Sequence, residues 1–506
     1  MSDDAIFDAR SGSMQSHAIN GALAIGFAQL AKLPFQAASL LFLPRLLTPT
    51  DYGIYAMVDP LVSVMGLLLN FGIGQAIIQA PALTRAQASG MFWVMTALGC
   101  GGALIMLAAS PLVAWLYHEP RAGVVAAASS LFLVIGGLTN VQESLLNRQM
   151  KFGWLAAISA VSIGVGLIVA VVAASMGAQY WALTLDYAAT SVVTLIGVWI
   201  GVGWAPRERP DFKGTLPFFK FGGAVMASDA AAFVAREADN VLLGRYAGPA
   251  QLGLYDRGRK LSLIPLQRIN QVLQYVMVPV LSRLAQDQQR YRRAYLRIVR
   301  LLMLLLTPGI IAIGATAQIL VPFVIGPQWA GAAPIFAWLT LAALHRPVSM
   351  TMNFLFVSQG RAKAYVVWSV FSAVTSLAAI LVGLRWGAIG VAAAFGITDL
   401  LLRLPFLWWW VTRQGPITQL DLYRAAAPFA AGAAACFAAL LLVQRVSAPN
   451  HLVFLAVNLS AAYAVAWSVA ATFKSGRATM ADALGLARSE LARFVQALAR
   501  RLRGQP

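Results

Sequence analysis

Charged side chains are scarce in this sequence of 506 residues, of which only 11% are Asp, Glu, Lys or Arg. A typical soluble chain carries about 25% charged residues. The hydrophobic share is 59%, and apolar runs long enough to cross a membrane recur from one end to the other. The alternating pattern of a membrane β-barrel is missing. The sequence therefore predicts an all-α polytopic membrane protein.

Cysteine, histidine and nucleotide-binding motifs are also rare or missing. Cys100 and Cys436 lie inside apolar segments, which indicates buried thiols rather than a disulfide or a metal site. The four histidines are spread apart and indicate neither a metal site nor a histidine-based proton relay: His17, His118, His345 and His451. No GxxxxGK[ST] loop occurs, which argues against P-loop hydrolysis of ATP. We therefore expect no catalytic residues, no metal and no cofactor.

Fourteen apolar spans can be placed along the chain. They cover residues 18–46, 52–79, 86–116, 122–147, 152–176, 179–204, 216–244, 251–279, 295–317, 332–357, 364–384, 387–412, 423–444 and 451–473. Residues 1–17 are polar, and the first apolar stretch runs too long for a cleavable signal peptide.

The basic residues favour one orientation of these spans. With fourteen spans, 25 Lys and Arg fall on the side that holds both termini, and the other side holds five: Arg45, Arg121, Arg245, Arg385 and Arg445. The positive-inside rule then predicts that both termini are cytoplasmic. The net charge of +19 is accordingly a topology signal, and it indicates no nucleic-acid partner.

One turn sequence occurs twice in the chain. LPRLLTPTDYGIY at 43–55 and LGRYAGPAQLGLY at 243–255 share Leu, Arg, Pro, Gly and Tyr at an offset of 200 residues. Both copies follow a predicted span on the outer side, and six spans separate them. An even number of spans predicts parallel repeats, related by an axis along the membrane normal. Arg45 and Arg245 are then expected at equivalent positions beside the mouth of a cleft.

Two further pairs of turns recur in the same order: Gly177-Ala178 with Gly387-Ala388, and NRQMK (147–151) with QGRAK (359–363). The expected architecture is therefore two pseudo-symmetric six-helix lobes plus two C-terminal helices. The predicted segments are a cytoplasmic N-terminus (1–17), an N-lobe (18–204), a linker (205–215), a C-lobe (216–412), two further spans (423–473) and a basic amphipathic cytoplasmic tail (474–506).

Several stretches of the sequence resemble a known family. RLLTPTDYGIYAMV at 45–58, FGIGQAIIQ at 71–79, LLNRQMKF at 145–152 and READNVLLGRYAGPAQLGLYDRGRKL at 236–261 resemble the Wzx-type polysaccharide flippases. These belong to the multidrug/oligosaccharidyl-lipid/polysaccharide exporter superfamily, and the likeness is greatest to its exopolysaccharide and colanic-acid-type branch. The resemblance implies a secondary-type transporter, not an enzyme. It would move undecaprenyl-diphosphate-linked oligosaccharide from the cytoplasmic to the periplasmic leaflet by alternating access.

Basic residues within the predicted spans are the candidates for substrate binding. We expect seven of them to bind substrate: Lys32, Arg236, Arg257, Arg259, Lys260, Arg268 and Arg346. An eighth, Arg403, also lies at membrane depth. A charge at that depth normally faces a protein interior or a watery cavity. By the resemblance, the helices that carry most of these bases would line a central cleft, where Lys and Arg would bind a lipid diphosphate. The alternatives are internal ion pairs and, for residues 257–260, snorkelling to the surface.

Acidic and amide groups within the spans are the candidates for energy coupling. They are Asp229, Asp239, Asn353 and Asp399. The resemblance implies coupling to H+ or Na+. A carboxylate beside paired bases is more often structural.

Two basic segments lie outside the predicted core: 286–300, which leads into the span at 295–317, and 478–503 in the tail. Both are predicted to be amphipathic helices on anionic lipid. Docking of the polysaccharide polymerase or other assembly proteins is the alternative.

Three other functions were weighed. A cation-coupled drug antiporter of the same superfamily would favour acidic cavity residues, whereas this cluster is basic. A glycan polymerase would present a large outer loop, whereas the longest one expected here is 318–331. A structural scaffold would not need bases at membrane depth.

Overall fold

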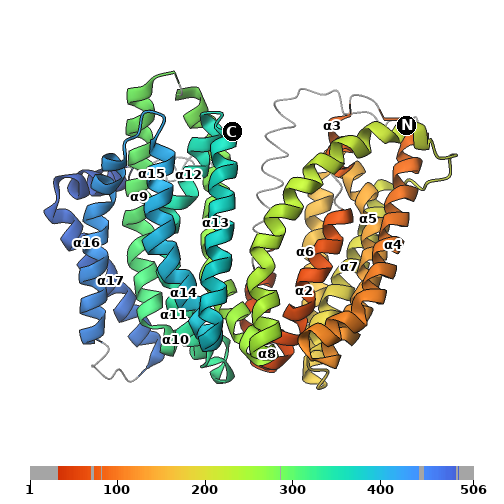
Figure 1. The fold of residues 1–506 in the computed structure, drawn as a ribbon, viewed down its shortest axis with the longest axis horizontal. Helices are drawn as coiled ribbons and strands as arrows, with labels where there is room; N and C mark the ends of the chain where they lie inside the picture. The colour runs from red at the N-terminus through yellow and green to blue at the C-terminus, as the bar shows by residue number, and fades with distance from the viewer. Residues whose placement is uncertain are drawn as a thin grey trace, which may run out of the picture. The chain divides into compact units, whose positions relative to one another are not determined.

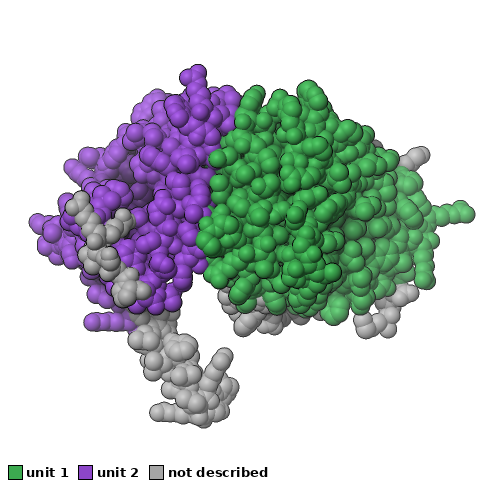
Figure 2. Space-filling model, turned by 90° about the horizontal axis from the view of Figure 1, so that it is seen from below, with its two compact units in different colours: residues 1–256, 324–329 green, residues 257–323, 330–506 purple. Residues whose placement is uncertain are grey.

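The computed structural model describes residues 32, 34–69, 73–80, 83–284, 286–443, 450–485 and 488, and its regular elements there are all helical (Figure 1). The chain divides into two compact units (Figure 2). Unit 1 holds residues 1–256 and 324–329, and unit 2 holds 257–323 and 330–506. The predicted division into two six-helix lobes stays a prediction.

Unit 1 is built from helices that pack side by side around α5, which contacts α2, α4 and α7. After a helical segment at 34–46 come α2 (Pro49–Leu69), α3 (Ile73–Gln79), α4 (Arg85–Tyr117), α5 (Pro120–Arg148), α6 (Phe152–Ser175), α7 (Trp181–Val202) and the first part of α8 (Phe212–Leu284). Helix α8 has one non-helical residue, Gly248, at φ 80° and ψ 175°. It separates the two spans predicted at 216–244 and 251–279.

Unit 2 packs α9 against α16 and α17, and α14 against α11 and α13. Its elements are α9 (Gln288–Ala315), α10 (Ala317–Ile325), α11 (Ala332–Ala343), α12 (Arg346–Ser358), α13 (Ala362–Gly383), η3 (Leu384–Trp386), α14 (Gly387–Thr398), η4 (Asp399–Arg403), α15 (Leu404–Thr412), α16 (Gln419–Val443) and α17 (His451–Thr472). The short η2 (Pro327–Trp329) belongs to unit 1.

Within the described residues, eight helices are long and apolar enough to cross a membrane. One of them, Lys363–Thr412, has 50 residues and is broken at Gly387, whose φ is 65°. A helix needs about 20 residues for one crossing, so this segment fits the two predicted spans at 364–384 and 387–412. Many large apolar side chains are exposed, including Leu104, Trp115 and Leu401. Such a surface suits lipid rather than water. The total of fourteen spans stays a prediction.

Three expectations about unit 2 need correction. The predicted outer loop 318–331 contains most of α10, because its apolar run continues the helical pattern. The predicted span 332–357 is divided into α11 and α12. The segment 286–300 does not form a separate surface helix but begins α9, with Tyr291, Tyr295 and Val299 fully buried in a hydrophobic core. Its Arg297 forms an ion pair of 3.0 Å with Asp482 of the tail.

The two copies of the repeated turn contact each other within unit 1. A Cβ atom on Gly53 would overlap the carbonyl oxygen of Pro249, and one on Gly253 would overlap that of Pro49. The glycine of each copy therefore lies against the proline of the other copy, which is the reciprocal pattern of a two-fold contact. The prolines stand at the start of a helix, where their fixed φ is tolerated. The expectation that the two copies are equivalent is met at this crossing.

A second pair of turns has the same backbone conformation at an offset of 210 residues. The amide of Lys151 donates to Leu146 O at 3.0 Å, and the amide of Arg361 donates to Phe356 O at 2.8 Å. The preceding residues, Met150 and Gly360, both have positive φ, at 53° and 66°. This agreement supports an internal duplication.

The side chains of these two basic residues also act alike. The Lys151 ammonium donates to Gly201 O at 3.0 Å, and the Arg361 guanidinium donates to Val411 O at 2.7 Å. Gly201 and Val411 lie in the last turns of α7 and α15 and are themselves 210 residues apart. Each base therefore satisfies a carbonyl that the helix end leaves unpaired.

We predict that Gly53→Ala lowers the stability of the protein by about 3 kcal/mol or more, because the new methyl group would overlap the Pro249 carbonyl. Gly66→Ala in the same helix is the matched control, since no described atom lies within 4 Å of its added Cβ. It should be neutral or stabilise by up to about 1 kcal/mol. Thermal unfolding of the purified protein would compare them, and equal midpoints would contradict the backbone crossing.

Candidate functional site

Two prolines disturb neighbouring helices of unit 2. Pro347 has no N–H to donate to the carbonyl of Ala343, and the helical run is interrupted at Leu344 and His345 between α11 and α12. Pro405 stands two residues after η4, a π-helical turn in which the amide of Leu404 donates to Asp399 O. π-helical turns are rare and often occur at functional sites. Both disturbances carry charged side chains.

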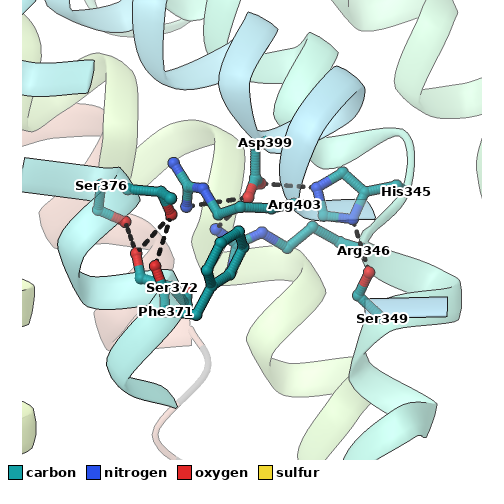
Figure 3. Close-up of polar contacts among 9 residues, drawn as sticks. His345, Arg346, Ser349, Phe371, Ser372, Ser376, Asp399 and Arg403 are labelled. Carbon is teal, nitrogen blue, oxygen red and sulfur yellow. Dashed lines mark hydrogen bonds and ion pairs between the residues drawn. The ribbon is translucent and has the colours of Figure 1, made fainter. Parts of the chain in front are cut away.

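These side chains converge on the carboxylate of Asp399 (Figure 3). His345 Nε2 lies 2.6 Å from Asp399 Oδ2, and Arg403 Nη1 lies 3.0 Å from Oδ1. Arg346 Nη2 lies 4.0 Å from Oδ2. The cluster of His345, Arg346, Asp399 and Arg403 is called the Asp399 cluster below. Asp399 and Arg403 are separated by one helical turn, whereas His345 is 54 residues away, so only the fold brings the group together.

The His345 ring has a hydrogen-bond partner on both nitrogens. Nδ1 lies 2.6 Å from Ser349 Oγ, which can donate to a neutral ring or accept from a protonated one. The carboxylate accepts from Nε2–H in either state. The ring can therefore gain or lose a proton without breaking a hydrogen bond, and only the charge of the cluster changes.

The two arginines are engaged to different degrees. Arg403 has only 4% of its side chain exposed, and its guanidinium carbon lies 4.5 Å over the Phe395 ring. Arg346 has 27% exposed, makes only the long ion pair, and its Nε has no hydrogen-bond partner among the described residues. With one carboxylate for two guanidinium groups, the cluster carries an excess of positive charge. Arg346 is the member that could bind an outside anion.

A second polar group lies in unit 1. Tyr255 Oη donates to Asp239 Oδ2 at 3.1 Å, and both side chains are buried. The Asn240 side chain donates to Glu237 Oε2 at 2.7 Å. Lys32 interacts electrostatically with Glu143 of α5. Asp239 therefore accepts a hydrogen bond from a buried phenol, and its role in coupling stays a prediction.

The structure places the predicted site residues unevenly. Arg257, Arg259 and Lys260 are half-buried on α8, and each has an interaction partner. Arg236, Arg268, Asp229 and Asn353 lie on α8 and α12, but their side chains are outside the described part of the chain. Arg346 and Asp399, selected for different roles, are neighbours in one cluster.

Sequence reasoning missed the partnership of His345 with Asp399 and the acid Glu143. The wide spacing of the histidines along the chain argues against a histidine relay, yet both ring nitrogens of His345 have hydrogen-bond partners. The signal available was the run His-Arg-Pro at 345–347, because a proline after two polar residues inside an apolar stretch marks a disturbed helix. Among the described residues no group of three or more His, Cys, Asp and Glu side chains could hold a metal ion.

Comparison with known proteins identifies the family. Residues 42–334 match the family model described as "Polysaccharide biosynthesis protein". The chain belongs to this family. It is 26% identical to the succinoglycan biosynthesis transport protein ExoT of Rhizobium meliloti (strain 1021) over 67% of this chain and 69% of that protein. It is 20% identical to the lipopolysaccharide biosynthesis protein WzxC of Escherichia coli (strain K12), over 77% and 80%.

Solved structures agree on the fold of this polysaccharide biosynthesis protein. The lipid II flippase MurJ, in an inward closed conformation, matches with a TM-score of 0.67 and 14% identity over 90% of this chain and 98% of that chain. An inward-facing MATE multidrug transporter matches with a TM-score of 0.57 and 14% identity over 78% and 95%. The polysaccharide family member is thus a multi-pass membrane protein with the fold of these transporters, as the resemblance implied.

We predict that Asp399→Ala destabilises the protein by about 3–5 kcal/mol, because Arg403 and His345 would stay buried without their carboxylate. Asp287→Ala, which removes an exposed cap and its ion pair with Arg290, should cost about 1 kcal/mol. Thermal unfolding would compare the two variants. Equal losses would mean that the Asp399 cluster contributes little to the fold.

Proposed function

We propose that this protein is a flippase for undecaprenyl-diphosphate-linked oligosaccharides used in exopolysaccharide or other surface polysaccharide biosynthesis. It would carry the substrate from the cytoplasmic to the periplasmic leaflet of the bacterial inner membrane by alternating access between two lobes, with both termini in the cytoplasm. Membership of the polysaccharide biosynthesis family, together with transport proteins among its relatives, is the main support.

The chemistry of the substrate explains the excess of buried bases. A diphosphate loses its water when its lipid crosses the membrane, and guanidinium groups can replace that water with charge-assisted hydrogen bonds. The Nε of Arg346 has no hydrogen-bond partner among the described residues, and its side chain is partly exposed. We assign it the leading role in diphosphate binding. Lys32, Arg236, Arg257, Arg259, Lys260 and Arg268 complete the proposed cationic cleft.

Energy coupling is assigned to the Asp399 cluster. His345 can take up a proton while keeping both hydrogen bonds, and that proton would add positive charge beside Arg346. Protonation would therefore strengthen the attraction of the cluster for the diphosphate. Asp229, Asp239 and Asn353 remain the alternative sites for H+ or Na+. Contact with a polysaccharide polymerase or other assembly proteins belongs to the same proposal.

A drug antiporter is the second candidate, supported by the MATE fold. It would bind cations, and the cationic Asp399 cluster is poorly suited to them.

We predict that Arg346→Ala lowers transfer of a fluorescent undecaprenyl-diphosphate oligosaccharide across proteoliposomes by roughly tenfold to a hundredfold, the value of a charge-assisted hydrogen bond. Arg385→Ala is the control, because this arginine is exposed in η3 and makes no ion pair among the described residues. Both variants should unfold at the wild-type temperature. Equal transfer by both would remove Arg346 from the site, and transport of cationic dyes without saccharide transfer would favour the antiporter.

We also predict that His345→Asn abolishes the stimulation of transfer by an imposed proton gradient, because an amide cannot titrate in the range where histidine does. Transfer without a gradient should persist, since Asp399 keeps its bond to Arg403. The same proteoliposomes with proton and sodium gradients would give the result. Retained stimulation by protons would move the coupling site elsewhere.

A further inference from the structure

The crossing of the repeated turns is flanked by two arms that are reciprocal as well. Arg45, in the first copy, donates to Val324 O at 3.3 Å. Arg245, in the second copy, contacts His118 at 2.8 Å between Nη1 and Nδ1. The neighbouring positions agree: Trp329 Nε1 donates to Pro44 O at 2.8 Å, and the Tyr117 ring lies against Gly244. We call the crossing and its two arms the clasp.

The two arms differ in one chemical respect. Arg45 donates to a backbone carbonyl, Val324 O, which accepts a hydrogen bond at any pH. The partner of Arg245 is an imidazole nitrogen. Because arginine is always charged and can only donate, His118 Nδ1 must accept, and it can do so only in the neutral ring. A proton on Nδ1 would set two cations against each other at hydrogen-bond distance.

In the part of the chain that the structure describes, two carboxylates near His118 are already engaged by other groups. Glu119 is held by Arg121 through two hydrogen bonds of 2.8 and 2.9 Å, and these hold the pKa of Glu119 below its usual value. Asp51, at the start of α2, accepts from Thr48 and is close enough to influence Arg121. Phenols also lie nearby: Tyr117 precedes His118, Tyr180 influences Arg121, and Tyr246 lies beneath the Arg245 guanidinium. Histidine is the type of side chain that ordinarily changes its charge between pH 5 and 8.

We propose that His118 is a proton-binding site and that its protonation releases the Arg245 arm of the clasp. The bond joins the loop after α4 to the second copy of the turn, so its loss frees one side of the crossing while the Arg45 arm stays closed. At the side of the membrane predicted to be periplasmic, acidification would then favour opening of the clasp. The inference rests on the proposed function only for that orientation and for the use of the opening in transport.

The test measures the clasp directly, without substrate. Spin labels on Val124→Cys and Gln251→Cys, both exposed, would report the separation of the two sides in a Cys100→Ser/Cys436→Ala background. The full-length protein in nanodiscs would be measured at about pH 8 and about pH 5.5, on either side of the histidine range. We expect longer distances at the lower pH.

Substitutions separate the proton effect from a structural one. His118→Asn keeps an acceptor at the position of Nδ1, tolerates the φ of 53° at this residue and cannot titrate, so it should give the short distance at both pH values. Arg245→Gln should give the long distance at both. His451→Asn, at the exposed start of α17, is the control and should respond like the wild type.

A pH response that survives in His118→Asn, or a wild type without a response, would overturn the proposal. Because no saccharide is used, failure of the flippase assay would leave this result intact. A normal flippase with a pH-insensitive clasp would overturn the proton site alone.

Discussion

Unit 1 depends on a close contact between two backbone segments, which leaves no room for a side chain. Gly53 and Gly253 each lie against a proline carbonyl of the other turn, and any larger residue would separate them. The prolines start the helices that follow and so fix the direction in which α2 and the second part of α8 leave the crossing. Arg45 and Arg245 lie eight residues before these glycines, and they contact Val324 near the end of α10 and His118 in the loop after α4. The clasp is thus built around one contact, and its symmetry follows from the duplicated sequence.

The low dielectric of the membrane explains the remaining polar contacts. Every helix end and every proline leaves a carbonyl without its usual donor, and lipid offers none. Lys151 and Arg361 supply donors at two helix ends, and Arg148 donates to the carbonyls of Ile77 and Ala80 after α3 at 2.8 and 2.6 Å. Several of the basic residues in loops predicted to be cytoplasmic therefore also bind backbone carbonyls within the protein. The same cost requires Asp399 and Arg403 to pair once they are buried.

The sequence could predict whatever depends on length, composition or local pattern. Apolar runs located the helices from α4 to α7 within a few residues, and the repeated turn predicted a relation that the crossing at Gly53 and Gly253 displays. The sequence could not predict contacts between residues that are far apart in the chain. His345 and Asp399 are 54 residues apart in the sequence. Tyr291 lies in a basic segment predicted to lie on lipid, yet this segment begins α9 and Tyr291 packs into a hydrophobic core. Those facts depend on which helix faces which, and periodicity in one helix does not contain that information.

The duplication also shows which charged residues and prolines of the second copy have no counterpart in the first. At the offset of 210 residues, the positions of His345, Asp399 and Arg403 correspond to Ile135, Ala189 and Val193, and Pro347 and Pro405 correspond to Gly137 and Leu195. In the first copy, α5 and α7 run through these positions without a break or a π-helical turn. A helix pair of this kind therefore forms without the prolines and without charged side chains at these three positions. The Asp399 cluster costs desolvation that the first copy avoids, so a role in function explains its presence better than a role in folding.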